Sequence, residues 1–238
     1  MERVTLRRFT AVLLAALMIS FGGTVRAGDR SDSPLLTRTA ILSHLCRPDG
    51  NPLMSYRALR HMTASTRGGR MAASMDVWTS LDSTGRFTFE IVSESGSPLI
   101  RRRVLRAALE AEQQNQTAEA REQAALTTEN YEFLEMRPDA EHLMKIDIRP
   151  RRKHLMLIDG AVFVEDNTAD LVRIEGQLPK RPSMWTRRVQ IEREYKRIDG
   201  VHVPVSMTST ADVLIAGASN FSMTYDYTEI NGQPVAHP

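Results

Sequence analysis

The stretch "TRRVQIEREYKRIDGVHVPVSMTSTADVL", residues 186–214, contains two runs of alternating apolar and polar residues separated by Asp199 and Gly200. The apolar members of the two runs are Val189, Ile191 and Tyr195, then Val203, Val205 and Met207. Such alternation predicts strands with one apolar and one solvated face. Asp-Gly is a dipeptide that tight hairpin turns prefer, because both central positions of the turn need positive φ. The stretch therefore predicts an antiparallel hairpin that is apolar on one face.

The same pattern recurs over most of the chain, with Asp159 and Gly160 as a second expected hairpin turn. The predicted strands cover residues 56–66, 71–82, 86–93, 131–136, 141–149, 153–158, 161–165, 170–177, 186–198, 201–214 and 218–230. Consecutive hairpins make the sheet antiparallel, and a sheet of about 11 strands with one apolar face is expected to curl. We therefore predict an α+β fold built on a strongly curved antiparallel half-barrel covered by helices.

Two segments have the composition of helices. Residues 35–45 place apolar side chains three and four apart, and Pro48 and Gly50 follow as a stop signal. Residues 98–128 begin with Ser97 as N-cap and Pro98 at the first helical position, and they contain no glycine or further proline. They predict one long helix of about 45 Å after the third strand. Its first half is expected to dock on the core, and the half from Glu110 to Gln123 to be exposed or protruding.

The first 27 residues have the pattern of an export signal. Three arginines within residues 3–8 precede an apolar run over residues 9–21, and Val25 and Ala27 supply small residues before a cut. We expect cleavage after Ala27, which leaves residues 28–238 as a single soluble domain. The leader holds four of the 31 basic and one of the 29 acidic residues, so 27 basic and 28 acidic residues remain, a net charge of −1. The mature chain therefore has no basic excess that would indicate nucleic-acid binding.

Motifs for catalysis and cofactor binding are absent from the sequence. It contains no GxGxxG, P-loop, HExxH, CxxC or GxSxG motif, and its six histidines have no metal-ligand spacing. The acidic stretch 165–170 is expected to be a hairpin turn, since it lacks the glycine and distal glutamate of a calcium loop. Cys46 is the single cysteine and is expected to be a buried or incidental thiol. We expect no enzyme activity, no cofactor and no metal.

The apolar faces of the predicted strands are the candidate site. An antiparallel sheet that curls around helices either fills its interior or leaves a hydrophobic hollow, and the pattern does not separate the two outcomes. The candidate lining residues are Val77, Leu81, Phe87, Phe89, Ile91, Met144, Ile146, Val172, Ile174, Trp185, Val189, Ile191, Val203, Val205, Phe221, Met223 and Tyr225. Trp185 follows a connection broken by Pro179 and Pro182, where it either caps the mouth of the hollow or plugs the core.

The order of these elements resembles the LolA/LolB-like superfamily, and more closely the proteins called outer membrane lipoprotein-sorting protein. The stretches that carry the resemblance are "NYEF" (130–133), "IRPRRKHLMLIDGAVFVED" (148–166), "VRIEGQLPKRPSMW" (172–185) and "YDYTEING" (225–232). The resemblance implies an open half-barrel closed by helices, an apolar interior that takes acyl chains, and a periplasmic location. The superfamily's carriers keep a basic residue beneath a helical lid, and no residue of this sequence matches that motif.

The sequence thus predicts a monomeric periplasmic carrier or binding protein for a lipid or an acylated lipoprotein. The alternative is a scaffold with a filled core whose exposed helix docks a partner, and an undetected hydrolase is a third reading. Basic runs lie at residues 101–103 and 149–153 and at Lys180, Arg181, Arg187 and Arg188. If these runs converge at one rim they would meet anionic head groups or a membrane-protein partner; otherwise they are separate solvated faces.

Overall fold

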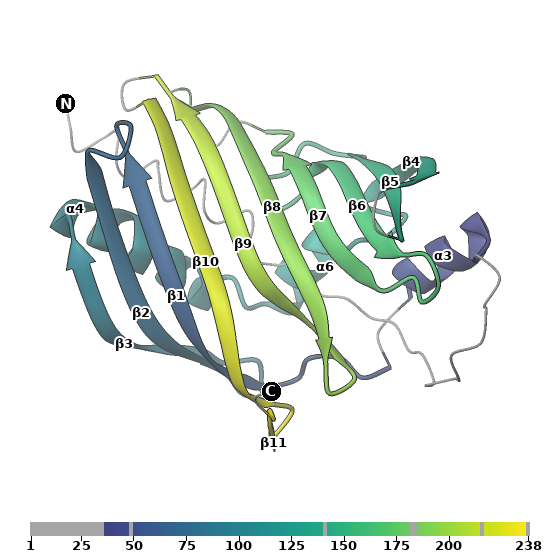
Figure 1. Ribbon diagram of the computed structural model, residues 1–238, viewed down its shortest axis with the longest axis horizontal. Coiled ribbons are helices and arrows are strands. Elements are labelled where there is room, and N and C mark those ends of the chain that lie inside the picture. The colour runs from purple at the N-terminus through teal and green to yellow at the C-terminus, as the bar shows by residue number, and fades with distance from the viewer. Residues whose placement is uncertain are drawn as a thin grey trace.

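The computed structural model describes residues 36–47, 50–139, 142–180, 184, 186–214 and 217–236. The predicted leader, the expected stop at Pro48 and the position of Trp185 lie outside these residues. Figure 1 shows that the described chain is dominated by one large sheet, with helical segments on one side of it.

The sheet has eleven strands, and every strand pair in it is antiparallel. The strands are β1 Tyr56–Thr66, β2 Met71–Leu81, β3 Phe87–Gly96, β4 Tyr131–Pro138, β5 Leu143–Pro150, β6 Asp159–Glu165, β7 Leu171–Gln177, β8 Thr186–Ile198, β9 Val201–Val213, β10 Gly217–Ile230 and β11 Gln233–Pro234. Their order is β3-β2-β1-β10-β9-β8-β7-β6-β5-β4, and β11 pairs with β10. In the described part of the chain β3 and β4 form free ends, so the sheet is not closed.

Two meanders make up this sheet, and the pairing of β1 with β10 joins them. In that pair Arg60 lies opposite Tyr225, and Met62 lies opposite Met223. The Asn231 side chain reinforces the junction, because its Oδ1 accepts from the Met54 N–H at 2.8 Å and its Nδ2 donates to the Pro52 carbonyl at 2.9 Å. The pairing places the start of the first strand beside the end of the last long one.

The hairpin of β8 and β9 confirms the prediction from residues 186–214, with Asp199 at φ 48° and Gly200 at φ 80°. The predicted strand at 153–158 is wrong. His154 caps this stretch locally, because its Nδ1 accepts from the Met156 N–H at 3.3 Å and its carbonyl from the Leu157 N–H at 3.3 Å. These bonds take backbone groups that a strand would offer to a neighbour. Asp159 and Gly160 consequently begin β6 instead of forming a hairpin turn.

The single long helix is also a wrong prediction. The segment forms α4 Pro98–Ile100, a π-helical turn η1 Arg101–Leu105 and α5 Arg106–Gln114, followed after a break by α6 Ala118–Ala124. At the break, Asn115 Nδ2 donates to the Ala111 carbonyl at 2.8 Å, and Thr117 Oγ1 accepts from the Ala120 N–H at 3.1 Å. Asparagine and threonine side chains compete with the helical backbone in this way, so they favour caps over helix interiors.

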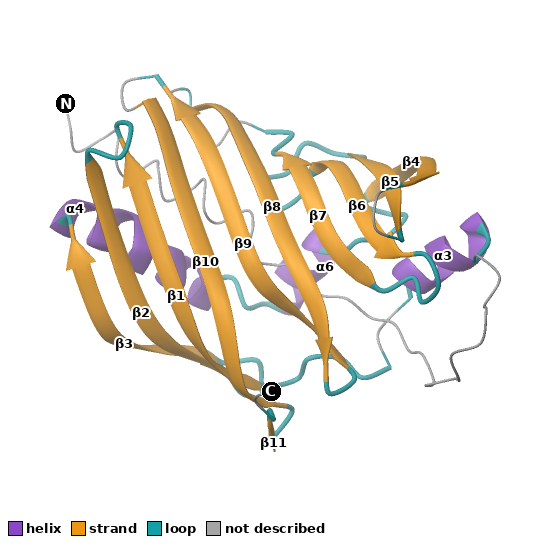
Figure 2. Cartoon of the chain, in the orientation of Figure 1, coloured by secondary structure: helices purple, strands orange, loops and turns teal. Residues whose placement is uncertain are grey.

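The second half of this segment is not exposed throughout, contrary to expectation. Ala111, Glu112 and Ala124 are buried. The turn η1 contacts β1, β2 and β3, and α5 contacts β3. Figure 2 shows these helices lying behind the β1–β3 end of the sheet. The segment therefore packs on one face of the sheet along much of its length.

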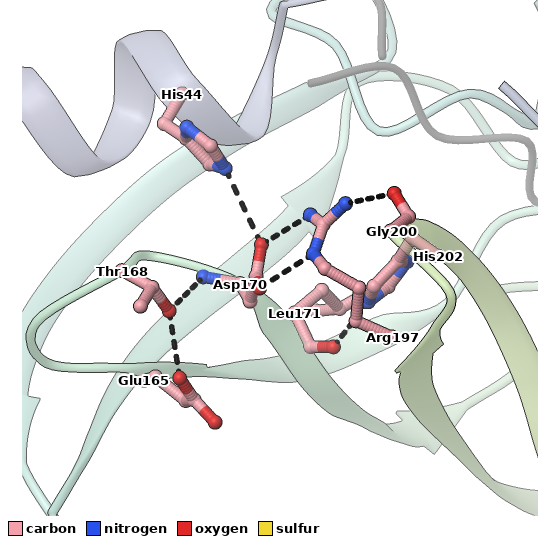
Figure 3. Close-up of polar contacts among 8 residues, drawn as sticks. All are labelled: His44, Glu165, Thr168, Asp170, Leu171, Arg197, Gly200 and His202. Carbon is pink, nitrogen blue, oxygen red and sulfur yellow. Dashed lines mark hydrogen bonds and ion pairs between the residues drawn. The ribbon is translucent and has the colours of Figure 1, made fainter. Parts of the chain in front are cut away.

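Helix α3, Arg38–Leu45, begins at Thr37, whose hydroxyl accepts from the Ala40 N–H at 3.3 Å, and it buries Ile41 and Leu45. Figure 3 shows its docking contact, where His44 points toward the carboxylate of Asp170 on the β6–β7 turn. The two side chains are 3.7 Å apart, and Arg197 Nε donates to the same carboxylate at 2.8 Å. The acidic stretch 165–170 is thus a turn, as predicted, and its Asp170 links α3 to the β8–β9 hairpin.

We expect Asp170→Asn to lower the free energy of unfolding by about 1–3 kcal/mol at pH 7, through loss of charge-assisted hydrogen bonds. Burial alone would raise the pKa of Asp170, but the bonds from Arg197 and His44 outweigh burial and hold it well below its usual value. This stabilisation is present above the unfolded pKa of about 4 and is lost as the pH falls toward the folded pKa.

Urea unfolding at pH 7 and about pH 3 measures this effect, with Asp212→Asn on the exposed face of β9 as the matched control. The difference between wild type and Asp170→Asn should shrink at the lower pH, whereas the control should stay close to wild type at both. A difference that is equal at the two pH values would contradict the role of the Asp170 charge.

Candidate functional site

One face of the sheet carries a continuous row of buried side chains at the level of Met62, and all but one of them are apolar. The register places its members side by side from β2 to β5, in the order Met75, Met62, Met223, Met207, Arg193, Ile174, Val162 and Ile146. All are buried, with at most 3% of the side chain exposed. Four of the eight are methionines, whose flexible thioethers adapt to irregular neighbours. The face toward the helices is therefore the candidate binding surface.

Most of the predicted lining residues belong to one hydrophobic cluster on this face. Those that are buried are Val77, Phe87, Ile146, Ile174, Val189, Ile191, Val203, Phe221 and Met223. Those that are half-buried against the cluster are Leu81, Phe89, Ile91, Met144, Val205 and Tyr225. The alternation in the sequence therefore identified residues that the fold brings together.

Val172 and Trp185 are the two remaining candidates. A register shift between Phe163 and Val164 pairs Val164 with Leu171, so Leu171 is buried and Val172 is only half-buried outside the cluster. A β-bulge of this kind breaks the two-residue period on which the prediction for Val172 rested. Trp185 lies outside the described residues.

The main feature that the sequence reading missed is a buried ion pair between the sheet and α5. Arg60 on β1 is 1% exposed and Glu112 on α5 is 5% exposed. Arg60 Nη1 donates to Glu112 Oε2 at 2.5 Å, and Arg60 Nη2 donates to Oε1 at 2.9 Å. This paired geometry is the strong form of a guanidinium–carboxylate interaction. It fastens the helix to a mostly apolar face of the sheet.

Aromatic rings enclose the Arg60 guanidinium. Its Cζ lies 4.6 Å from the ring centre of Tyr225 and 5.1 Å from that of Phe87, and Nη2 donates to the Tyr56 hydroxyl at 2.6 Å. Burial alone would lower the pKa of Arg60, but the negative charge of Glu112 outweighs it and raises the pKa well above the usual value. Burial raises the pKa of Tyr56, so its hydroxyl stays protonated. Arg60 is therefore a fixed cation beneath α5.

A second arginine, Arg193 on β8, is buried in the methionine row and is 3% exposed. A signal for both arginines is visible in the sequence. Arg60 falls between Ala58 and Met62, and Arg193 between Ile191 and Tyr195, each on the inward parity of its strand. A charged residue on the apolar parity of a strand indicates a functional or paired position, because an isolated buried charge is strongly disfavoured.

Two cavities that the described residues line lie away from the methionine row. One, of about 400 Å³, lies between α6 and the stretch before β6, with Gln123, His154, Met156 and Lys180 among its lining. The other, of about 450 Å³, is an open groove on the opposite, polar face of β5–β9, with Lys145, Asp147, Glu175 and Glu192 among its lining. Of the predicted lining residues only Ile191 borders either cavity.

Other kinds of site receive no support from the geometry. Among the described residues no group of three histidine, cysteine, aspartate or glutamate side chains has the arrangement of a metal site. Within the same residues, no helix combines the length and the apolar character that a membrane span requires. Cys46 is half-buried, and burial followed by the charge of Glu129 raises the pKa of its thiol. A protonated thiol is a poor nucleophile.

No family model and no curated protein matches this chain.

Proposed function

We propose that this protein binds a lipid or a lipid-modified protein between the apolar face of the sheet and the helical segment α4–α5. In this proposal the sheet is a curved half-barrel, and α4–α5 is a lid that closes over the methionine row. The observation that carries the proposal is the Arg60–Glu112 pair, a charged link placed between two apolar surfaces.

A permanently closed core does not need a charged link between its two surfaces. Replacing a buried ion pair by well-packed apolar residues is often neutral or stabilising, so Arg60 and Glu112 are a weak means of making a permanent core stable. Their two hydrogen bonds instead define one closed position of α5 and leave charged groups that water can solvate once α5 lifts. This combination suits a lid that opens and closes again in register.

Ligand binding would replace the contacts that opening removes. Each buried methylene of an acyl chain contributes about 0.8 kcal/mol, so a long chain offsets the exposure of several apolar side chains. The methionines of the row, Met62, Met75, Met207 and Met223, provide adaptable surface for such a chain. The resemblance to the LolA/LolB-like superfamily and the export pattern of residues 1–27 support the same function in the periplasm.

The alternative, a scaffold that docks a partner through residues 110–128, has less support. Ala111, Glu112, Ala124 and Leu126 are buried, so much of that segment is already occupied by contacts within the chain. The remaining exposed positions do not form the free helical rod on which the alternative relied.

The test is uptake of a fluorescent fatty acid by the purified protein, together with organic-solvent extraction of bound lipid. We expect saturable uptake by wild type and at least about tenfold weaker uptake by Met207→Trp, because a bulky ring fills the interior beside the row. Thr208→Trp is the matched control, since Thr208 is the next residue of β9 and is exposed on the opposite face. Absence of both extracted lipid and uptake by wild type would overturn the proposal.

A further inference from the structure

Arg193 is the one charged residue in the buried row that runs from Met75 on β2 to Ile146 on β5. Its strand neighbours in that row are Met207 on β9 and Ile174 on β7, and both are buried. The alternation of β8 directs its side chain to the same face as Val189 and Ile191. The guanidinium therefore lies inside the proposed lipid site.

The contacts of Arg193 are weak for a buried cation. Nη1 lies 3.5 Å from the Tyr195 hydroxyl, and Nη2 lies 3.8 Å from the Met207 thioether sulfur. The first separation exceeds the ordinary range for an N–H···O hydrogen bond, and the thioether sulfur is a weak acceptor. Among the residues that the structure describes, no carboxylate lies within ion-pair distance of Arg193.

Among the described residues, the buried charges of the interior do not balance. Glu112 is paired with Arg60 through both of its oxygens, and its charge reaches Arg193 only from beyond ion-pair distance. Two guanidinium groups thus face one carboxylate beneath α5. An uncompensated buried charge is strongly disfavoured, and Arg cannot relieve it by losing its proton.

We propose that Arg193 binds the anionic head group of an amphiphile, a carboxylate or a phosphate, whose hydrocarbon chain lies along the methionine row. This inference rests on the proposed function and specifies the ligand class that the interior takes. A planar guanidinium matches the two oxygens of a carboxylate or phosphate, and an anion would give Arg193 stronger acceptors than the Tyr195 hydroxyl and the Met207 sulfur. Head group and chain then meet complementary surfaces in one row, the cation at Arg193 and the thioethers at Met207, Met223, Met62 and Met75.

Three amphiphiles with the same chain test the proposal: palmitate, hexadecyl phosphate and hexadecanol. We expect wild type to bind one or both anionic probes roughly tenfold to a hundredfold more tightly than hexadecanol, the range for a buried charge-assisted hydrogen bond. The comparison between palmitate and hexadecyl phosphate distinguishes a carboxylate ligand from a phosphate ligand. Dissociation constants are measured by displacement of a fluorescent fatty alcohol, which carries no charge of its own.

Variants locate the preference at Arg193. Arg193→Met should remove the preference for anionic probes over hexadecanol, and Arg193→Lys should restore part of it. Lys196→Met is the matched control, because it removes one positive charge from an exposed position of the same strand and should leave the preference intact. Glu112→Gln should increase the preference, since it removes the negative charge that competes for the interior cations.

Two outcomes overturn the inference in different ways. If wild type binds all three probes equally, or if Arg193→Met keeps the preference, the head-group site is wrong while the proposed lipid-binding function stands. If no probe binds wild type, the proposed function fails and the inference fails with it. The wild-type comparison needs no variant, so the test holds even if Arg193→Met does not fold.

Discussion

Alanine in place of Glu112 is expected to lower the free energy of unfolding by about 3–5 kcal/mol, because the variant leaves the Arg60 guanidinium buried without its carboxylate. Arg60 would keep the Tyr56 hydroxyl at 2.6 Å, the Met223 thioether at 3.8 Å and the surrounding aromatic rings. The loss should appear in urea unfolding as a lower midpoint with an unchanged slope. Glu110→Ala, an exposed position two residues earlier in α5, should stay within about 0.5 kcal/mol of wild type.

The double variant Arg60→Met, Glu112→Met separates the ion pair from the fold. Removing both charges leaves no uncompensated group, so the double variant should recover most of the stability that Glu112→Ala loses. It should nevertheless position α5 less uniquely, because apolar contacts have no directional hydrogen bonds. A double variant that is as unstable as Glu112→Ala would show that the loss comes from packing and not from the buried charge.

Alanine in place of Gly160 is expected to lower the free energy of unfolding by at least about 3 kcal/mol, because β6 and β7 have no room for a methyl group there. A Cβ atom on Gly160 would overlap the Glu175 carbonyl oxygen and lie 2.5 Å from the Gly176 Cα. Both obstacles are backbone atoms, so relief requires the two strands to separate. Gly160 pairs directly with Gly176, so a Cβ atom on either glycine would meet backbone atoms of the other strand.

Gly69→Ala gives the comparison that isolates the steric effect. Gly69 lies in the β1–β2 turn at φ 86°, and nothing lies within 4 Å of a Cβ built on it. Its substitution therefore adds only the conformational strain of an alanine at positive φ, about 1–2 kcal/mol. Thermal unfolding of the two variants measures the difference, and a Gly160→Ala protein as stable as Gly69→Ala would contradict the close approach of β6 and β7.

Much of the sheet follows from local patterns in the sequence. The β8–β9 hairpin was predictable because the alternation of Val189, Ile191 and Tyr195 and the positive φ of Asp199 and Gly200 depend on neighbouring residues alone. The two wrong predictions, the strand at residues 153–158 and the single long helix at residues 98–128, have local causes that composition does not reveal. His154 caps the stretch that was expected to be a strand, and Asn115 with Thr117 interrupts a segment made almost entirely of helix formers.

The candidate site was predictable only in its apolar part. Two-residue alternation selected Val77, Ile146 and Met223 correctly as members of one cluster, but it passed over Arg60 and Arg193 because a charge breaks the apolar pattern. The partner of Arg60 is 52 residues away in the chain, and no local rule relates β1 to α5. Long-range pairs of this kind depend on how complete elements dock.

The sequence by itself determined where most strands begin and end, the position of the β8–β9 hairpin turn, and which face of each strand is apolar. These features arise from backbone preferences and side-chain alternation over a few residues. The tertiary structure decided that β1 pairs with β10, that Glu112 reaches Arg60, and that Arg193 is buried with no carboxylate of the described residues within ion-pair distance. Those outcomes depend on burial and charge summed over segments far apart in the chain, and only the folded arrangement brings those segments together.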